Sequence, residues 1–429
     1  MAIETFEFKE VGEKGYRWEL DNGLTVFYLP KPNFKKTFGV FAANYGAVDF
    51  AVENYNFPPG IAHFLEHKLF EEPHGNIEEE FAKLGVNVNA FTTHIHTCYF
   101  FSATGNFYTA LELLLNFVQA PHFTEENVKK EQGIIAQEIE MYRDDPNWVV
   151  YLNLLKALYP NHPVSKDIAG TIEDIMKITP QILYQCYNRF YNPHNMVLLV
   201  AGDLDLLKLR EFIEENQKGK KFGEKYKYIR NISYDPFIPN KKLVEEKMEV
   251  ARPILCMGFK DKDVGQKGKE LFKKEIATLL LMETILGRGS KLYNNLYDEG
   301  IIDSSFGVEY TAEDGFGHTI LSLETDDPLG FVERLELEIN KIKEQGLDKE
   351  EFILNKRKLE GLNLMELNSM ENVVLGFMGD YFRDCNYFDR VQVIREVTFE
   401  DVQQRLYEHF DFKMSAISII NNSILTKKR

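Results

Sequence analysis

Two histidines and a glutamate stand close together early in the sequence, in the order His63-Phe-Leu-Glu66-His67. If this stretch is helical, the three side chains project from one face, because residues three and four apart are neighbours on a helix. Two imidazoles at this spacing can bind one Zn²⁺, and the carboxylate between them can reach a metal-bound water. The set predicts hydrolysis by an activated water. The same stretch also fits an ordinary amphipathic helix, so a third ligand is needed.

The neighbouring sequence favours a helix at this position. Pro58-Pro59-Gly60 is typical of a helix start. Apolar residues then recur every four positions, at Ile61, Leu65 and Leu69, and Pro73 ends the run. Further along, Tyr108 to Val118 has the pattern of an amphipathic helix. Strand patterns flank the histidines on both sides. Residues 16–30 alternate around an Asp-Asn-Gly turn and predict a hairpin, and residues 86–92 and 97–103 predict a second strand pair.

A long acidic helix supplies the candidate third ligand. Thr124 has the type and position of an N-cap, and the helix that follows should run to about Arg143. Glu131 and Glu138 lie seven residues apart in it, which places both carboxylates on one face, two turns apart.

Composition limits the classes of function. The chain has 429 residues, is 44% hydrophobic and carries a formal charge of −17, which argues against a nucleic acid or an anionic membrane as partner. No apolar run reaches the roughly 18 residues of a membrane span, and no signal peptide is visible, so we expect a cytoplasmic protein. Four scattered cysteines predict buried free thiols in a reducing compartment.

The second half of the chain repeats the first. Residues 81–89 align with residues 296–304, and residues 179–190 align with residues 398–410, each running into an apolar strand. A half-length repeat predicts two similarly folded domains of α+β class, each a mixed, largely antiparallel sheet packed with helices. A Lys-, Gly- and Asn-rich stretch marks the midpoint. We therefore expect a catalytic domain over 1–215, a linker over 216–242 and a non-catalytic repeat domain over 243–429.

Several of these motifs together resemble one enzyme family. The sequence His-Phe-Leu-Glu-His, then Asn89-Ala90-Phe-Thr, and then the helix from Glu131 to Glu138 are similar to the inverted-motif zinc peptidases of the pitrilysin/insulinase family. The resemblance covers nearly the whole chain, including the duplication. In length it is similar to the short, two-domain bacterial members and to the catalytic subunit of mitochondrial processing peptidase.

This resemblance implies a role for each motif residue. His63, His67 and Glu138 would be the ligands of one Zn²⁺ per chain, Glu66 the general base, and Glu131 a residue that contacts and orients a ligand. Asn89 and Ala90 would belong to the strand on which an extended substrate peptide is added. The implied activity is that of a zinc endopeptidase.

The sequence departs from the family pattern at one place. Single-chain members carry an Arg and a Tyr in the second half that hold the substrate backbone, whereas this chain has Tyr297 and Asp303 or Ser304 there. The resemblance therefore implies a catalytic subunit whose related, non-catalytic partner supplies the Arg/Tyr pair. Two alternatives remain open: a non-catalytic scaffold or presequence-binding subunit of the same fold, and a zinc hydrolase that does not act on peptides.

Overall fold

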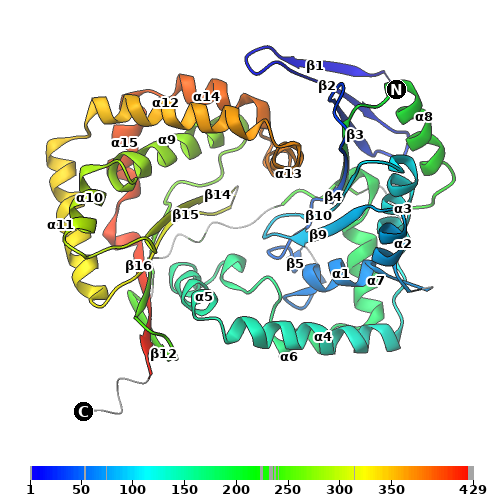
Figure 1. The fold of residues 1–429 in the computed structure, drawn as a ribbon. Coiled ribbons are helices and arrows are strands. Elements are labelled where there is room, and N and C mark those ends of the chain that lie inside the picture. Colours follow the sequence, from blue (N-terminus) through cyan, green and yellow to red (C-terminus); the bar gives the residue numbers. More distant parts are fainter. Residues whose placement is uncertain are drawn as a thin grey trace. The chain divides into compact units, whose positions relative to one another are not determined.

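The computed structural model describes residues 2–52, 55–73, 75–222, 226–230, 235, 238–239, 241–313 and 315–423. They form two compact units, and neither unit is continuous in sequence. Unit 1 comprises residues 1–139, 166–230 and 366–382, and unit 2 comprises residues 140–165, 231–365 and 383–429. Each unit contains one large sheet covered by helices (Figure 1).

Unit 1 is built on a seven-stranded sheet in the order β1-β2-β3-β11-β4-β10-β9. All neighbours are antiparallel except β3 and β11, and β9 lies at one edge. The hairpin predicted over residues 16–30 and the strand pair predicted over residues 86–103 are both confirmed. The strands are β1 (Glu4–Phe8), β2 (Glu13–Glu19), β3 (Thr25–Pro30), β4 (Thr37–Ala43), β9 (Asn87–Thr92), β10 (Thr97–Ala103) and β11 (Met196–Gly202), with two short ladders, β5 (Ala51–Val52) with β6 (Tyr55–Asn56) and β7 (Glu71–Glu72) with β8 (Gly75–Asn76).

Helices cover both faces of this sheet. On one face α1 packs against β9 and β10, and α3 packs against β4 and β10. On the other face lies α13, which comes from the second half of the sequence and packs against β4 and β11. The ring of Phe27 on β3 meets Phe377 and Tyr381 of α13 at centroid distances of 4.9 and 5.4 Å. The helices are α1 (Ile61–Leu69), α2 (Ile77–Lys83), α3 (Phe107–Gln119), α4 (Glu125–Arg143), α6 (Ile172–Ile175), α7 (Pro180–Phe190), α8 (Leu206–Gln217) and α13 (Met370–Tyr381).

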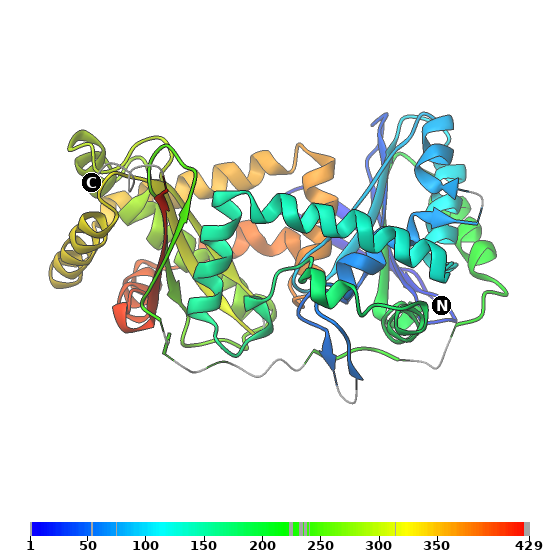
Figure 2. The same cartoon turned by 90° about the horizontal axis from the view of Figure 1, so that it is seen from below.

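Unit 2 is built on a five-stranded sheet in the order β12-β16-β13-β15-β14. On one face α9, α11 and α15 enclose an apolar core with this sheet. On the other face lies α5, from the first half of the sequence, which runs alongside β13 and β16 (Figure 2). The elements are β12 (Leu243–Met248), β13 (Ile254–Lys260), β14 (Gly307–Ala312), β15 (Gly317–Glu324), β16 (Ser415–Asn422), α5 (Pro146–Leu158), α9 (Gly268–Leu286), α10 (Lys291–Asp298), α11 (Pro328–Gln345), α12 (Lys349–Glu366), α14 (Arg390–Glu396) and α15 (Phe399–His409).

The two sheets confirm the duplication. Strands β3-β11-β4-β10-β9 and β12-β16-β13-β15-β14 follow the same order with the same directions, one parallel pair and then antiparallel pairs. Details repeat as well. Gly85 after α2 and Gly300 after α10 both have positive φ, at 69° and 72°, and end their helices with the same pattern of backbone hydrogen bonds. Thr179 and Thr398 both cap the helix that follows them.

The packed units differ from a simple division of the chain at its midpoint. The predicted ranges 1–215 and 243–429 divide the chain near its midpoint, whereas each packed unit also holds one helix from the other half of the sequence, α5 or α13. Part of the predicted linker, 216–242, lies outside the described residues. The four cysteines are free and buried, as predicted. Among the described helices, none combines the length and the apolar composition that crossing a membrane would take.

Candidate metal centre

Helix α1 carries the histidine motif, and a close backbone approach fixes its first turn. Gly60 is the N-cap, at φ 90°. A Cβ on Gly60 would lie 2.4 Å from the carbonyl oxygen of Ala169, and a Cβ on Gly170 would lie 2.4 Å from that of Pro59. Both glycines have positive φ, which side chains rarely tolerate. The two loops can therefore approach this closely only with glycine at both positions, and this contact holds the start of α1 in place.

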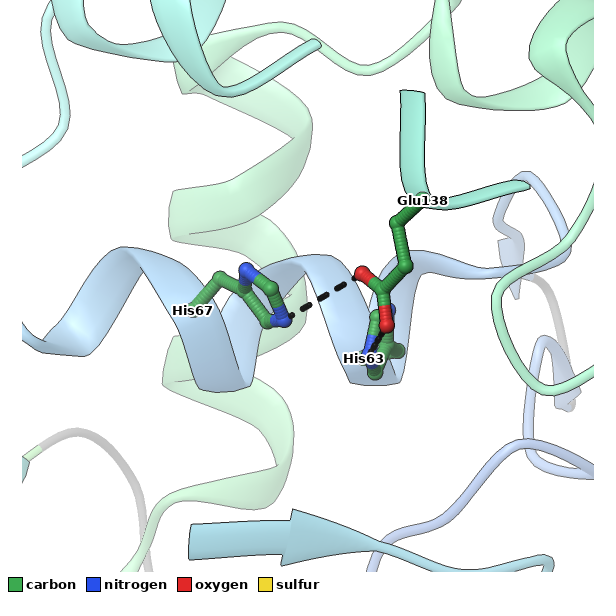
Figure 3. Close-up of side chains that lie close together, drawn as sticks. All are labelled: His63, His67 and Glu138. Atoms are coloured by element: carbon green, nitrogen blue, oxygen red, sulfur yellow. Dashed lines mark ion pairs between the residues drawn. The ribbon is translucent and has the colours of Figure 1, made fainter. Parts of the chain in front are cut away.

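His63, His67 and Glu138 converge as predicted. Each offers a ligand atom, and these atoms lie within 4.8 Å of one another, the one such group of three found among the described residues. The Glu138 carboxylate of α4 faces both rings of α1 (Figure 3). Its Oε1 lies 3.8 Å from His63 Nε2, and its Oε2 lies 3.7 Å from His67 Nε2. The two ring centroids are 4.5 Å apart.

These distances suit a shared metal ion. They are too long for good N–H···O hydrogen bonds, which span about 2.7 to 3.2 Å. Two ligands on one tetrahedral Zn²⁺, with bonds of about 2.0 to 2.2 Å, lie about 3.4 Å apart, so only a small inward shift is needed. Burial and the neighbouring His67 lower the pKa of His63 to about 3, which keeps this imidazole neutral, as a ligand must be. Two neutral nitrogens and a carboxylate fit Zn²⁺ with one position open.

Glu131 lies two turns before Glu138 on α4 and contacts one of the candidate ligands, His67. Its Oε1 is 3.2 Å from His67 Nδ1, and its Oε2 is 3.6 Å from the ammonium of Lys68. Burial alone would raise the pKa of Glu131, but the hydrogen bond and charge of His67, with the charge of Lys68, bring it below its usual value. Burial lowers the pKa of His67, and the bond to Glu131 with the surrounding carboxylates raises it overall. Glu131 thus occupies the position expected of a residue that orients His67.

Glu66 points toward β9 from the same helix as the two histidines. It is 8% exposed, and its Oε2 accepts a hydrogen bond of 2.6 Å from Thr92 Oγ1. Burial raises the pKa of Glu66, against the opposing effect of this hydrogen bond and of His67. A carboxylate whose pKa is shifted toward neutrality is better matched to accepting a proton at neutral pH. The sequence did not single out Thr92 as a partner of Glu66.

A cavity of about 410 Å³ adjoins these residues in unit 1. Glu66, His67 and Glu131 line it, together with Asn89 and Ala90 on the edge strand β9. The Ala90 amide donates a hydrogen bond of 2.8 Å to the side chain of Asn89. An added strand that pairs with this amide would first have to displace the Asn89 side chain.

The equivalent helix of unit 2 has no ligand set. At the offset of the repeat, His63, Glu66 and His67 correspond to Thr278, Leu281 and Met282, and these three residues of α9 are buried. At the positions where single-chain family members carry the Arg/Tyr pair, this chain has other residues with contacts of their own. Tyr297 is half-exposed and stacks on Tyr293. Asp303 accepts hydrogen bonds from Ser305 and pairs with Arg252 at 2.7 Å, and these contacts together lower its pKa to about 2.

The sequence matches two family models and is similar to a known bacterial protein. The family model described as insulinase, peptidase family M16, matches residues 52–172, and the model described as peptidase M16 inactive domain matches residues 177–359. The chain is 39% identical to the uncharacterized zinc protease YmfH of Bacillus subtilis, over 95% of this chain and 96% of that protein.

Two solved structures have a similar fold. A crystal structure described as that of an M16-like peptidase from Alicyclobacillus acidocaldarius has 36% sequence identity and a TM-score of 0.91, covering 99% of both chains. A protease from Helicobacter pylori has a TM-score of 0.83 at 19% identity, covering 95% of this chain and 99% of that one. The second of these likenesses concerns the fold alone.

Proposed function

We propose that this chain, which belongs to peptidase family M16, the insulinase family, is a zinc-dependent endopeptidase acting on peptides or unfolded segments. The observation that carries the proposal is the convergence of His63, His67 and Glu138 beside the buried carboxylate of Glu66. The donor set fits Zn²⁺, and the relatives with high identity are described as a zinc protease and an M16-like peptidase. One zinc per chain is expected, because the equivalent positions of α9 carry no ligands.

The residues around the metal have separate roles in this proposal. His63, His67 and Glu138 would hold the ion, which would act as a Lewis acid that polarises the substrate carbonyl and makes water more acidic. Glu66 accepts the proton of the attacking water and passes it to the departing amine nitrogen. Thr92 fixes the orientation of Glu66 through its hydrogen bond. Glu131 holds His67 at Nδ1, so that Nε2 faces Glu138.

The edge strand β9 would bind the substrate. An extended peptide added beside Asn89 and Ala90 would displace the Asn89 side chain from the Ala90 amide and pair with β9 at the edge of the seven-stranded sheet. One of its side chains would then enter the cavity next to Glu66 and His67. Backbone pairing binds many sequences, so the cavity would set the preference for particular residues. A strand can be added only if the substrate is extended, which favours peptides and unfolded segments over folded proteins.

A partner chain completes the proposal. Tyr297 and Asp303 cannot replace an Arg/Tyr pair, since one is a stacked phenol and the other an anion already paired with Arg252. We infer a heterodimer in which a related chain without zinc ligands supplies this pair to the substrate backbone. A homodimer would not suffice, because both copies lack the two residues.

The metal is tested by elemental analysis and peptide cleavage on the same samples. The parent should contain about one zinc per chain. His63→Ala and Glu138→Ala should lose both the metal and the cleavage of an unfolded peptide substrate. Glu140→Ala removes an exposed carboxylate from the same helix and serves as the matched control, with metal and activity retained. Zinc retained in both ligand variants would show that the site is elsewhere.

The partner is tested by mixing. The isolated chain should cleave slowly, because a loosely held substrate backbone forfeits positioning, and a misplacement of about 1 Å can cost on the order of 10²-fold in rate. Adding the related chain with an Arg/Tyr pair should raise cleavage, and substituting either residue of that pair should remove the gain. Equal rates for the isolated chain and the mixture would refute the heterodimer and leave the zinc peptidase standing.

A further inference from the structure

Lys68 is a lysine with no exposed side chain, next to a candidate metal ligand. Its side chain is 0% exposed, although lysines are almost never fully buried unless an acid pairs with them. It follows His67 directly on α1, in a turn whose other residues are apolar or belong to the metal site. The peptidase roles assigned above to Glu66, Glu131 and the three ligands do not use it. A buried charge at this position therefore requires its own explanation.

Two carboxylates pair with the Lys68 ammonium. One is Glu71, which contacts Nζ directly, and the other is Glu131, whose Oε2 is 3.6 Å away. The opposite oxygen of Glu131 is the one that meets His67 Nδ1 at 3.2 Å. Lys68, Glu131 and His67 thus form a short series in which a cation holds one oxygen of a carboxylate while the other oxygen receives the imidazole N–H.

The burial of Glu131 makes this cation important. The Glu131 side chain is 9% exposed, so water contributes little to stabilising its charge. A buried carboxylate that loses its cation is an uncompensated charge, and the surrounding structure responds by moving it or by admitting water. Either response would shift the oxygen that holds His67. Metal-binding histidines depend on such a bond, which sets the tautomer and the direction of the ring.

We propose that Lys68 is a positioning residue of the metal centre. It holds Glu131 so that Oε1 faces His67 Nδ1, and through that bond it directs His67 Nε2 toward the ion. This inference rests on the metal centre of the proposed function, but not on the reaction carried out there. The competing explanation is that Lys68 only neutralises buried acids and so contributes to stability without acting on the metal.

A double-mutant cycle on zinc affinity separates these explanations. Four proteins are compared by competition with a chelator of known zinc affinity: the parent, Lys68→Met, Glu131→Gln, and the double variant. Lys68→Met should weaken zinc binding about tenfold or more, the range found when partners of metal-binding histidines are removed. In the Glu131→Gln background the same substitution should cause no further loss, because Lys68 acts through Glu131.

Lys260→Met is the matched control. Lys260 is also buried, with a side chain 1% exposed and a carboxylate of Asp235 at 3.7 Å, but it lies on β13 of unit 2. Its substitution should lower the unfolding temperature of the zinc-free protein without changing zinc affinity. If Lys68→Met does not fold, Lys68→Met/Glu71→Gln removes one charge of each sign and is compared with Glu71→Gln alone. Lys68→Met/Glu71→Gln should then bind zinc more weakly than Glu71→Gln alone.

The outcomes are distinct. Unchanged zinc affinity in the Lys68 variants, or an equal loss with and without Glu131, overturns the positioning role. A parent that binds zinc but cleaves no peptide refutes the proposed function and leaves the Lys68 result intact. A parent that binds no zinc refutes both.

Discussion

Replacement of Glu66 by glutamine should remove catalysis without weakening the fold. The glutamine side chain has the same shape, and its carbonyl oxygen can still accept the hydrogen bond that Thr92 Oγ1 donates at 2.6 Å. It cannot take a proton from water, however. General-base catalysis contributes about 10² to 10⁴ in rate, which corresponds to about 3 to 5 kcal/mol of barrier. We therefore expect kcat to fall by that factor in Glu66→Gln, with zinc content unchanged.

The stability of the same variant should change in the opposite direction. Burial raises the pKa of Glu66 above 4.5, so at neutral pH the folded state is penalised for holding the anion. Glutamine removes this penalty and keeps the Thr92 bond. The zinc-free variant should therefore be at least as stable as the parent at pH 7. The difference should shrink as pH falls through the raised pKa and vanish below about 4.5, where Glu66 is neutral in both states.

Three measurements on one preparation check this reasoning. Peptide cleavage gives kcat, elemental analysis gives zinc content, and denaturant unfolding of chelator-treated protein at several pH values gives stability. Glu140→Gln, an exposed acid on α4, is the control for a simple change of charge. A near-parental kcat would show that Glu66 is not the base. A stability lower than the parent's at pH 7 would mean that the anion is held by favourable contacts, contrary to the assigned effect of burial.

Three further predictions concern the metal, the start of α1 and the exchanged helix. Zinc affinity, measured by chelator competition, should fall as the pH drops through the pKa of His67, which lies above 6.5 in the metal-free protein, because a proton competes for the ligand nitrogen. In denaturant titrations, Gly60→Ala should lower the free energy of unfolding by about 2 to 4 kcal/mol, because of backbone strain and the clash at 2.4 Å. Gly133 is a helical glycine that faces open space, so Gly133→Ala should raise the free energy of unfolding by up to about 1 kcal/mol. A fragment of residues 1–215 lacks α13 and should show poorly dispersed amide NMR signals, which a fragment that also carries residues 366–382 should improve.

Much of the fold could be predicted because its signals are local. Periodicity and end signals predict three of its parts: helix α1 over Ile61–Leu69, helix α4 with Glu131 and Glu138 on one face, and the paired strands β9 and β10. The convergence of Glu138 on the histidines is a long-range contact, and periodicity alone contained no information on it. It was predicted through the family resemblance, because only a set of motifs seen together relates α4 to α1.

The residues that the sequence did not reveal act through contacts between distant segments. Lys68 looks like any surface lysine at the end of a helix until Glu131, 63 positions later, is placed beside it. Gly60 could be assigned to a helix start, but its need for positive φ depends on Gly170. Thr92 belongs to a strand pattern that says nothing of Glu66. In each case the partner is fixed by packing, which no local pattern describes.

The exchange of α5 and α13 has a similar cause. Both helices have an apolar face, and such a face can cover any apolar sheet, so amphipathicity cannot say which sheet each helix covers. Each helix has a different close contact with its sheet. On β13, Gly258 leaves the space that Leu154 and Leu158 of α5 fill, since a Cβ there would lie 2.5 Å from Leu158. On β3, the Phe27 ring instead projects between Phe377 and Tyr381 of α13. A small residue on one sheet and a large one on the other give each helix a different complementary surface. In both cases the fit depends on side chains that lie far apart in the sequence, which amphipathicity does not report.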